Sequence, residues 1–303
     1  MTAQFFRNLG AALAAPLALL PSAALAVEAG RPDPGQIGFQ ESVTPIMDSI
    51  EAFHNNLLLW IITGIVLLVF VLLAIVILRF NAKANPKPAT FTHNTLVEVV
   101  WTVLPIVVLI VIAIPSFAVL TDQLTIPDGQ RKYLGNEIFS WGQVDVPAPG
   151  LTIKATGEQW YWNYTYVDDD QSYDSYMLND ADRESLKPNE PRLLAVDNEL
   201  VVPVNTTVRV QVTASPSGVI HAFTVPSFGI KIDAVPGRLN ETWFNARKEG
   251  IYYGQCSELC GKDHAFMPIA VRVVSAEQFA TWLASLKESG DAETANATLV
   301  AAQ

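Results

Sequence analysis

Cysteine is scarce in this chain of 303 residues: the only two are Cys256 and Cys260. No C-x-x-C-H sequence is present, which excludes a covalently attached c-type haem. Basic residues are also few, 19 against 30 acidic ones, and the formal charge is −11. Nucleic acids are bound by basic surfaces, so they are excluded as partners. The same acidic charge favours docking of a basic protein.

Charged residues make up only 16% of the chain, whereas 50% of it is hydrophobic. A soluble domain of this size is rarely so apolar, which points to membrane segments. Two runs, Leu57–Leu78 and Val99–Leu120, contain no charged residue. Each is long enough to cross a hydrocarbon core of roughly 30 Å. We therefore predict two transmembrane helices, at about 55–80 and about 96–120.

Residues 1–26 have the pattern of a secretory signal peptide. Arg7 is the only charge, an apolar run follows from about Ala11 to Leu20, and Ala24-Leu25-Ala26 is a small-x-small cleavage site. The alternative is a third membrane anchor, but the run is too short to span a bilayer. We expect the segment to be removed, so that the mature chain begins outside the cytoplasm.

The loop between the two apolar runs is basic. It contains Arg79, Lys83 and Lys87 and no acidic residue, which by the positive-inside rule makes it cytoplasmic. A hairpin whose turn is inside has both ends outside. The N-terminus and everything after Thr121 are therefore predicted to lie on the outer face of the membrane, bound to it through the two helices.

Beyond the hairpin, short β-type runs separated by turn residues begin at Leu151. Many short strands without helices between them favour a sandwich or barrel. A helix is expected over Ala276–Glu288, with Ser275 as its N-cap. The predicted organisation is an N-terminal segment and hairpin over 27–122, a linker over 123–150, a β domain over 151–288 and a flexible tail over 289–303.

The two cysteines lie in the stretch GQCSELCGKDHAFMP, residues 254–268. In an oxidising compartment a disulfide is the default, but the i, i+4 spacing would close only a tiny loop. His264 and Met267 follow at once, and His221 lies at the start of another β-type run. Thiolates, imidazoles and a thioether are ligands that copper selects. A zinc site of two Cys and two His is the alternative, and it would leave Met267 unexplained.

One cysteine with two histidines and a methionine is the ligand set of a mononuclear blue copper site. A second cysteine changes that expectation, because two thiolates can each bridge two metal ions. A dinuclear copper site is predicted, in which each ion takes one histidine. Met267 and a backbone carbonyl are expected to fill the remaining, weaker coordination positions.

The stretches HAFTVPSFGIKIDAVPGRLNETWF and GIYYGQCSELCGKDHAFMP resemble cytochrome c oxidase subunit 2. The resemblance extends to GFQESVTPIMDSIEAFHN, EVVWTVLPIVVLI, GEQWYWNYTY and RLLAVDNELVVP, in the family's order. The signal peptide points to a bacterial form of the aa3 type. The resemblance implies a membrane-anchored α+β protein, a two-helix transmembrane hairpin followed by a periplasmic cupredoxin-like β-sandwich, in the bacterial inner membrane.

The resemblance also implies the ligands of the dinuclear copper (CuA) centre. Cys256 and Cys260 bridge both coppers, His221 and Met267 complete one ion, and His264 and the backbone carbonyl of Glu258 complete the other. The side chain of Glu258 reaches a magnesium ion shared with subunit 1. The alternative for Glu258 is a solvated loop acid. No haem belongs to this chain.

Electrons come from cytochrome c in this family, and the resemblance assigns Trp160 as the point where they enter. We expect an acidic rim of Asp168, Asp169, Asp170 and Asp174 to dock this basic donor, extended by Asp180, Asp182 and Glu184. The alternative is a solubilising charge run. The family often has an acid three residues before His221, whereas here that position is Gly218.

The resemblance places Glu98, just before the second apolar run, at the mouth of a proton-uptake path into subunit 1; the alternative is an interfacial acid. The expected function is electron transfer from cytochrome c to the haem–copper site of subunit 1, where oxygen is reduced to water with proton pumping. Subunits 1 and 3 are the implied partners. Retention of all copper ligands argues against a quinol-oxidising relative.

Two other functions remain as alternatives. A membrane-anchored copper-delivery or thiol-redox protein can also carry C-x-x-x-C and a distal histidine, but a single anchor and a βαβ pattern would be expected. An exported structural domain with a plain disulfide leaves the two histidines and the methionine unexplained.

Overall fold

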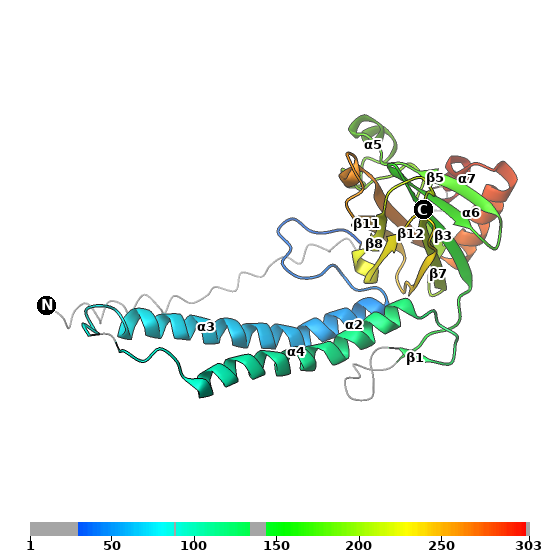
Figure 1. Ribbon diagram of the computed structural model, residues 1–303. Helices are drawn as coiled ribbons and strands as arrows, with labels where there is room; N and C mark the ends of the chain where they lie inside the picture. The colour runs from blue at the N-terminus through cyan, green and yellow to red at the C-terminus, as the bar shows by residue number, and fades with distance from the viewer. Residues whose placement is uncertain (1–29, 88, 134–143, 301–303) are drawn as a thin grey trace, which may run out of the picture.

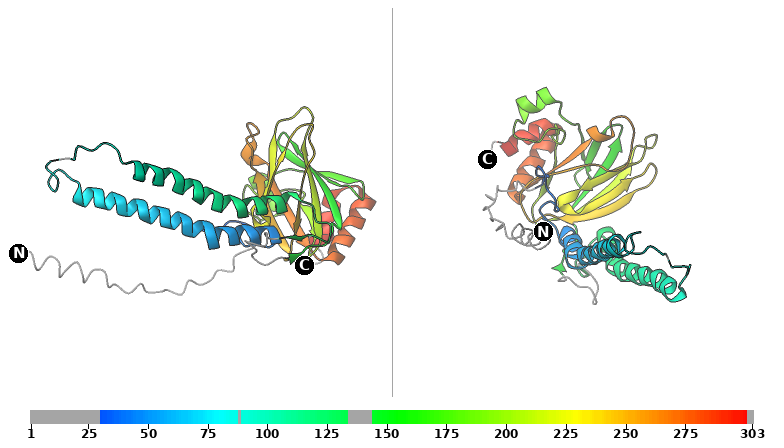
Figure 2. Two further views of the ribbon diagram at one scale, coloured as in Figure 1. Left: turned by 60° about the horizontal axis from the view of Figure 1, so that its bottom comes forward. Right: turned by 90° about the vertical axis from the view of Figure 1, so that its left-hand side faces the viewer.

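The computed structural model describes residues 30–87, 89–133 and 144–300, so the expected signal peptide lies outside the described residues. A pair of long antiparallel helices extends from a β domain (Figures 1 and 2). The first helical run comprises α2 (Pro45–Phe53), the π-helix η1 (His54–Leu58) and α3 (Leu59–Arg79), and the second is α4 (Thr95–Leu124). The first run begins about ten residues before the predicted start, and α4 continues four residues beyond its predicted end.

Both long helices have the composition and the exposure of membrane spans. In the most apolar 18-residue stretch of each run, 0% of the residues in the first run and 6% of those in α4 are buried within the chain. The proline residues at 105 and 115 stay inside α4 without ending it. Because so much apolar surface is left uncovered, lipid or other subunits must cover it.

The β domain consists of two five-stranded sheets, in the orders β10-β7-β3-β4-β5 and β6-β12-β11-β8-β9. The strands of the first sheet are β3 (Leu151–Glu158), β4 (Tyr161–Tyr166), β5 (Gln171–Ser175), β7 (Thr207–Ala214) and β10 (Asn240–Asn245). Those of the second are β6 (Leu200–Pro203), β8 (His221–Val225), β9 (Ile230–Ala234), β11 (Gly250–Cys256) and β12 (Pro268–Val274). The short 3-10 helix η2 (Pro226–Phe228) joins β8 to β9. The predicted fold, a two-helix hairpin followed by a β-sandwich, is confirmed.

Alternation along the strands produces the core between the sheets. In β3 and β4 every second residue is buried, as expected when one face of a sheet packs against a partner. The aromatic run of β4 therefore turns Trp162, Tyr164 and Tyr166 inward, each 0% exposed. Tyr166 ends this row by donating its hydroxyl to the carbonyl of Val201 at 2.6 Å, which ties the first sheet to the second.

The hairpin is attached to the β domain at both of its outer ends. At the start of α2, the amide of Val43 donates to Ser227 at 3.3 Å, and the amide of Arg247 donates to Val43 at 3.0 Å. At the end of α4, the indole of Trp243 donates to the carbonyl of Asp122 at 2.8 Å. The last carbonyls of a helix have no intrahelical partner, so β10 caps α4. The β domain is thereby held at a set height above the membrane.

The expectation of a flexible tail after Ser289 is wrong for most of that segment. Helix α6 (Ala276–Ser289) begins with the predicted Ser275 cap and ends at Gly290 (φ 67°). A further helix, α7 (Ala292–Val300), then folds back on α6. Trp282 donates to Asn296 at 2.9 Å, and α7 buries three apolar side chains, Ala292, Ala295 and Leu299. Their i, i+3, i+7 spacing forms a stripe that supplies the driving force for packing.

Part of the predicted linker over 123–150 is also ordered. Strands β1 (Lys132–Tyr133) and β2 (Val144–Asp145) pair in antiparallel register, and Tyr133 is 1% exposed. Tyr133 packs edge-on against Trp243, with ring centroids 5.0 Å apart. This segment therefore packs beside the end of α4 rather than hanging free.

A buried ionic cluster attaches the long β5–β6 connection, which contains α5 (Asp180–Leu186), to the second sheet. Glu199, only 2% exposed, accepts from Lys187 at 2.5 Å and from Arg272 at 2.9 Å. Although burial opposes ionisation of Glu199, the hydrogen bonds and charges of Arg272 and Lys187 bring its pKa down to about 2. Glu190 lies beside the same cations, and burial together with the charge of Glu199 raises its pKa.

We predict that Glu199→Gln lowers the free energy of unfolding by about 3 kcal/mol, because two largely buried cations lose their main partner. The folded pKa lies below the ordinary value of 4.5, so the stabilisation is present above about pH 4.5. It disappears as the pH falls toward 2. Urea unfolding of the purified chain at several pH values measures both effects. Glu184→Gln, at an exposed acid of α5, is the control; equal stability of the two variants would contradict the prediction.

Candidate metal centre

The candidate site lies at one end of the second sheet, where three segments meet. His221 is the first residue of β8, and Cys256 is the last residue of β11. These two strands are neighbours, with Cys256 opposite Phe223 in the register. The chain then passes through Cys260 and the 3-10 helix η3 (His264–Phe266) to Met267, just before β12. The segment from Cys256 to Met267 thus places five of the predicted ligands beside the sixth, His221.

The Cys256 sulfur is surrounded by donor atoms. It lies 3.7 Å from the Cys260 sulfur, 3.7 Å from His221 Nδ1 and 3.3 Å from the carbonyl oxygen of Glu258. The cysteines are free thiols, so the predicted default of a disulfide is not what the structure contains.

The Cys260 sulfur has the remaining donors around it. His264 Nδ1 is 3.4 Å away, and Met267 Sδ is 3.6 Å away. The four other donor atoms predicted from the resemblance therefore gather around the two sulfurs. The sequence already indicated this proximity, because five of the six residues lie between Cys256 and Met267.

Burial favours the neutral forms of His221 and Cys260. His221, Cys256, Cys260 and Met267 are 0 to 3% exposed. Burial lowers the pKa of His221, and the nearby His264 adds to this effect. Burial, followed by the neighbouring Cys256, raises the pKa of the Cys260 thiol to about 12. A metal cation would reverse this preference by stabilising the thiolates.

The donor set fits metal binding by both distance and chemistry. Metal–thiolate bonds are about 2.3 Å long, so two donors of one ion can lie up to about 4.6 Å apart. The Cys256 sulfur lies 3.7 Å from both the Cys260 sulfur and His221 Nδ1, within this limit. The Nε2 atom of His221 is buried without a hydrogen-bond partner, as in a ring held by packing alone. Thiolate, imidazole and thioether donors together suit copper.

Two residues of the first sheet support the site from the opposite side of the core. The indole of Trp162 donates to the carbonyl of Met267 at 3.3 Å, and its ring centroid lies 6.0 Å from that of His221. Gly157 in β3 faces the His221 ring so closely that an added Cβ would lie 2.8 Å from its Cδ2 atom. Only a residue without a side chain leaves room for this imidazole.

Trp160 is tied directly to the metal-ligand loop. Its indole Nε1 donates to the carbonyl of Cys260 at 3.0 Å. Gly261, at φ 121°, brings its backbone against the same ring, where a Cβ would lie 2.9 Å from Cζ2. The ammonium of Lys262 lies 5.0 Å from the ring centroid. Trp160 is partly exposed, so one bonded path leads from the surface through its indole to a cysteine ligand.

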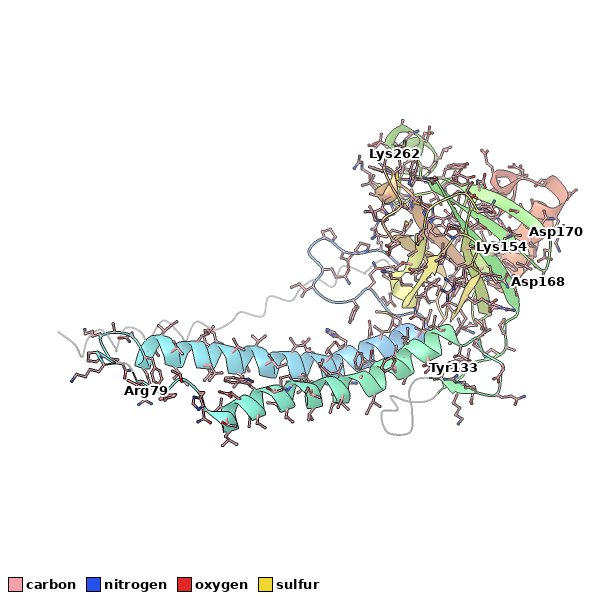
Figure 3. All side chains as sticks on the ribbon, viewed as in Figure 1. Arg79, Tyr133, Lys154, Asp168, Asp170 and Lys262 are labelled. Atoms are coloured by element: carbon pink, nitrogen blue, oxygen red, sulfur yellow. The ribbon has the colours of Figure 1, made fainter. Side chains whose placement is uncertain are left out.

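The expected docking rim of Asp168, Asp169 and Asp170 is not at Trp160. These residues follow the far end of β4, which at about 3.3 Å per residue spans roughly 20 Å. Figure 3 shows Lys262 on the upper left of the β domain and Asp168 and Asp170 on its right.

The three aspartates instead build the β4–β5 turn. Asp168 accepts from the amide of Thr152 at 3.1 Å, Asp169 pairs with Lys287 at 2.6 Å, and Asp170 has a left-handed φ of 53°. The three aspartates follow Trp160 closely in the sequence, but the length of β4 separates them from it in space.

Asp174 lies closer to Trp160, because β5 returns along β4. It stands opposite Asn163 in the register, and its carboxylate accepts from Asn163 at 2.8 Å and from the Tyr176 hydroxyl at 3.4 Å. Tyr176 in turn stacks on Tyr161, with ring centroids 4.4 Å apart. Of the four predicted docking acids, Asp174 alone is near the indole.

The remaining predicted residues have simpler surroundings. Glu258 is exposed, while its carbonyl oxygen lies 3.3 Å from the Cys256 sulfur. Glu98 lies in the first turn of α4 and accepts from the amide of Asn94 at 3.2 Å, while Asn94 caps the helix by accepting from Val97. Within this single chain, Glu98 therefore contributes to the N-terminal cap of α4.

Sequence reasoning did not single out Gly157, Gly261 or Lys262. Each acts through a residue that is distant in the chain: Gly157 through His221, and the other two through Trp160. Only Gly157 carries a sequence signal, because a glycine within a strand suggests a close approach of another group.

The fold and the site together define a class: a β-sandwich protein with a candidate metal site, attached to a hairpin of two helices long and apolar enough to span a membrane. Residues 32–119 match the family model described as cytochrome c oxidase subunit II, transmembrane domain. Residues 151–274 match the model of that subunit's periplasmic domain.

Two relatives illustrate the similarity. A probable cytochrome c oxidase subunit 2 from Rickettsia felis is 51% identical over 258 residues, which is 85% of this chain and 74% of the relative. Cytochrome c oxidase subunit 2 from Cereibacter sphaeroides is 43% identical over 269 residues, 84% of this chain and 81% of the relative. The crystal structure of the periplasmic domain of subunit II from Bradyrhizobium japonicum is 58% identical, with a TM-score of 0.43. It matches 48% of this chain and 99% of that domain.

The chain belongs to the cytochrome c oxidase subunit 2 family, and it is therefore a subunit of an oxidoreductase complex of the haem–copper type.

We predict that Gly157→Ala weakens metal binding, because the new Cβ would lie 2.8, 2.9 and 3.0 Å from three atoms of His221. Displacing a packed ring typically costs about 1–3 kcal/mol, and here the ring carries a ligand atom. Competition of the purified chain with a copper chelator measures the affinity. Gly38→Ala is the control, since nothing lies within 4 Å of a Cβ there. Equal copper affinity in both variants would show that the close approach is irrelevant to the site.

Proposed function

We propose that this chain accepts electrons from a cytochrome c at a dinuclear copper (CuA) centre. It passes them to the haem–copper site of subunit 1, where oxygen is reduced to water with proton pumping. One observation carries the proposal: two buried free thiols 3.7 Å apart, surrounded by two imidazoles, a thioether and a backbone carbonyl. Neither a zinc site nor a disulfide accounts for Met267 at 3.6 Å from Cys260.

Cys256, Cys260, His221, His264, Met267 and the carbonyl of Glu258 are the groups that would hold the two copper ions. When bound, the pair of coppers supplies one-electron transfer with a charge shared between two ions. The surrounding residues provide rigidity: β11, β8 and β12 hold the donors, and Trp162 and Gly157 hold the loop and the His221 ring. Little has to move when the site gains an electron.

The chain keeps water and protons away from this exchange. The two sulfurs and His221 are at most 3% exposed, so an added electron is not accompanied by uptake of a proton from solvent. Thiolates held by metal ions stay deprotonated in both oxidation states. Electron transfer is thereby separated from proton transfer at this point of the enzyme.

Trp160 is the proposed point at which electrons enter. Its indole is partly exposed and is joined to the Cys260 carbonyl by a 3.0 Å hydrogen bond. Asp174 lies on the neighbouring strand, where its charge would attract a basic cytochrome c. The acids of α5, Asp180, Asp182 and Glu184, stand at the same end of the domain as Lys262 (Figures 1 and 3). We therefore move the proposed rim from the β4–β5 turn to this end.

The proposed setting is the bacterial inner membrane. Its two spans would pack against subunit 1, the β domain and N-terminus would lie in the periplasm, and subunit 3 would complete the core. The basic loop beginning at Arg79 supports this orientation. The exposed Glu258 carboxylate is free to reach a magnesium ion at the boundary with subunit 1.

We predict that the purified chain binds two coppers and that an electron paramagnetic resonance spectrum shows one unpaired electron shared by both. We expect Cys256→Ser to lose both the ratio of two coppers per chain and the shared-electron signal, because one bridging sulfur is gone. Ser257→Ala, at the adjacent position, serves as the control and keeps both. One copper with a mononuclear signal would contradict the proposal, as would a metal-free chain whose thiols resist alkylation.

We predict that Glu98→Gln slows turnover of the assembled oxidase about tenfold, equivalent to about 1.4 kcal/mol of activation free energy. The glutamine keeps an oxygen to accept from the Asn94 amide, but it cannot carry a proton. Glu98→Ala removes both properties and should be equally slow. If Glu98→Gln turns over and pumps normally while Glu98→Ala does not, Glu98 acts only as a helix cap.

A further inference from the structure

A positive charge lies over the proposed electron port. The Lys262 ammonium is 5.0 Å from the centroid of the Trp160 ring, and the Lys262 side chain is 74% exposed. It also forms an ion pair with the next residue, Asp263, at 2.8 Å. A cytochrome that approaches the exposed edge of Trp160 therefore meets these two opposite charges first.

The fold holds this ion pair in place. Gly261, the preceding residue, lies against the Trp160 ring, and the carbonyl before it accepts the indole hydrogen bond. Asp263 begins the turn of η3, where its carbonyl accepts from the amide of Phe266 at 2.9 Å. Both charged residues thus stand on a short segment anchored at Trp160 on one side and at His264 on the other.

The charges around this pair are negative. Glu158 precedes Trp160 by two residues, at the end of β3, and Asp174 lies on β5 opposite Asn163, three residues after Trp160. Both acids act on the same part of the surface, since both help to raise the pKa of the Tyr161 hydroxyl, behind the larger effect of burial. At the centre of the proposed port the charges of Lys262 and Asp263 cancel each other. The neighbouring charged residues, Glu158 and Asp174, are acidic.

We propose that the Lys262–Asp263 pair is a specificity-determining element of the electron port. It fits a donor cytochrome whose haem edge is uncharged at its centre and whose cationic groups lie outside that centre. It disfavours a donor that presents a lysine directly to Trp160. This inference rests on the proposed role of Trp160, and it adds the kind of partner that the port accepts.

The physical basis is the distance dependence of charge interactions. At contact, two ammonium groups several ångströms apart repel each other even when partly screened by water. Cations placed farther out would instead face Glu158, Asp174 and the acids of α5. Charges across an interface affect the association rate constant more than the affinity of the complex, and added salt weakens this effect.

The test uses the assembled oxidase, and the probe is a mitochondrial cytochrome c with lysines around its haem edge. Lys262→Gln leaves Asp263 unpaired, and we expect kcat/KM to rise about two- to fourfold at low ionic strength. Asp263→Asn leaves Lys262 unpaired and should lower kcat/KM by a similar factor. Lys262→Arg keeps the charge over the ring and should change nothing.

Lys154→Gln is the matched control, since it removes the same charge from a strand away from the port (Figure 3). It should leave kcat/KM unchanged. The copper spectrum, measured in every variant, should be that of the unmodified enzyme, and all differences should vanish at high ionic strength. Changes of the same sign in Lys262→Gln and Asp263→Asn, or no change in either, would overturn the proposal.

Trp160→Phe separates this proposal from the one on which it rests. Loss of rapid copper reduction in Trp160→Phe, with no charge effect in the other variants, would overturn the role of Lys262 alone. Unimpaired copper reduction in Trp160→Phe would overturn both the port and its specificity element.

Discussion

Two thiol sulfurs held 3.7 Å apart in a buried place are the constraint on which the rest of the β domain depends. Burial raises the pKa of the Cys260 thiol, and a bound cation would favour its thiolate. The sulfurs lie on a single loop, but the loop alone does not place them. β8 supplies His221, and the first sheet supplies Trp162 against Met267 and Gly157 beneath the imidazole. The sandwich is thus the means by which a short, polar loop keeps one geometry.

A second constraint connects this site to the membrane. The attachment of both helices to the sandwich fixes the position of the site relative to the outer ends of the hairpin. β10 caps the end of α4 through Trp243, while Arg247 and Ser227 hold the start of α2 on the other side. In contrast, the most apolar stretches of the two helices are almost completely exposed, because the rest of the chain does not cover them. The outer ends are therefore anchored within the chain, and the spans are left for the other subunits.

The fold class and the residues that gather at the candidate metal site could be predicted from the sequence, whereas the surroundings of Trp160 could not. Cys256, Cys260, His264 and Met267 were recognisable because they lie within twelve residues at spacings that metals use. The aspartates at 168–170 seemed to belong to Trp160 because they follow it closely, yet β4 carries them to the opposite end of the sheet. The small polar residues after Ser289 suggested disorder, yet Ala292, Ala295 and Leu299 form an apolar stripe on α7.

By itself, the sequence determined the features that arise from neighbouring residues: two apolar runs, a basic loop between them, alternating strands and a loop rich in soft ligands. Local periodicity and spacing suffice for these, because each is a property of one continuous segment. Only the tertiary structure decided which distant residues meet. The hydrogen bond from Trp160 to Cys260, the space left by Gly157 for His221 and the position of Lys262 over an indole all join separate segments. Such contacts depend on how two sheets pack and which strand ends coincide, and no local pattern encodes them.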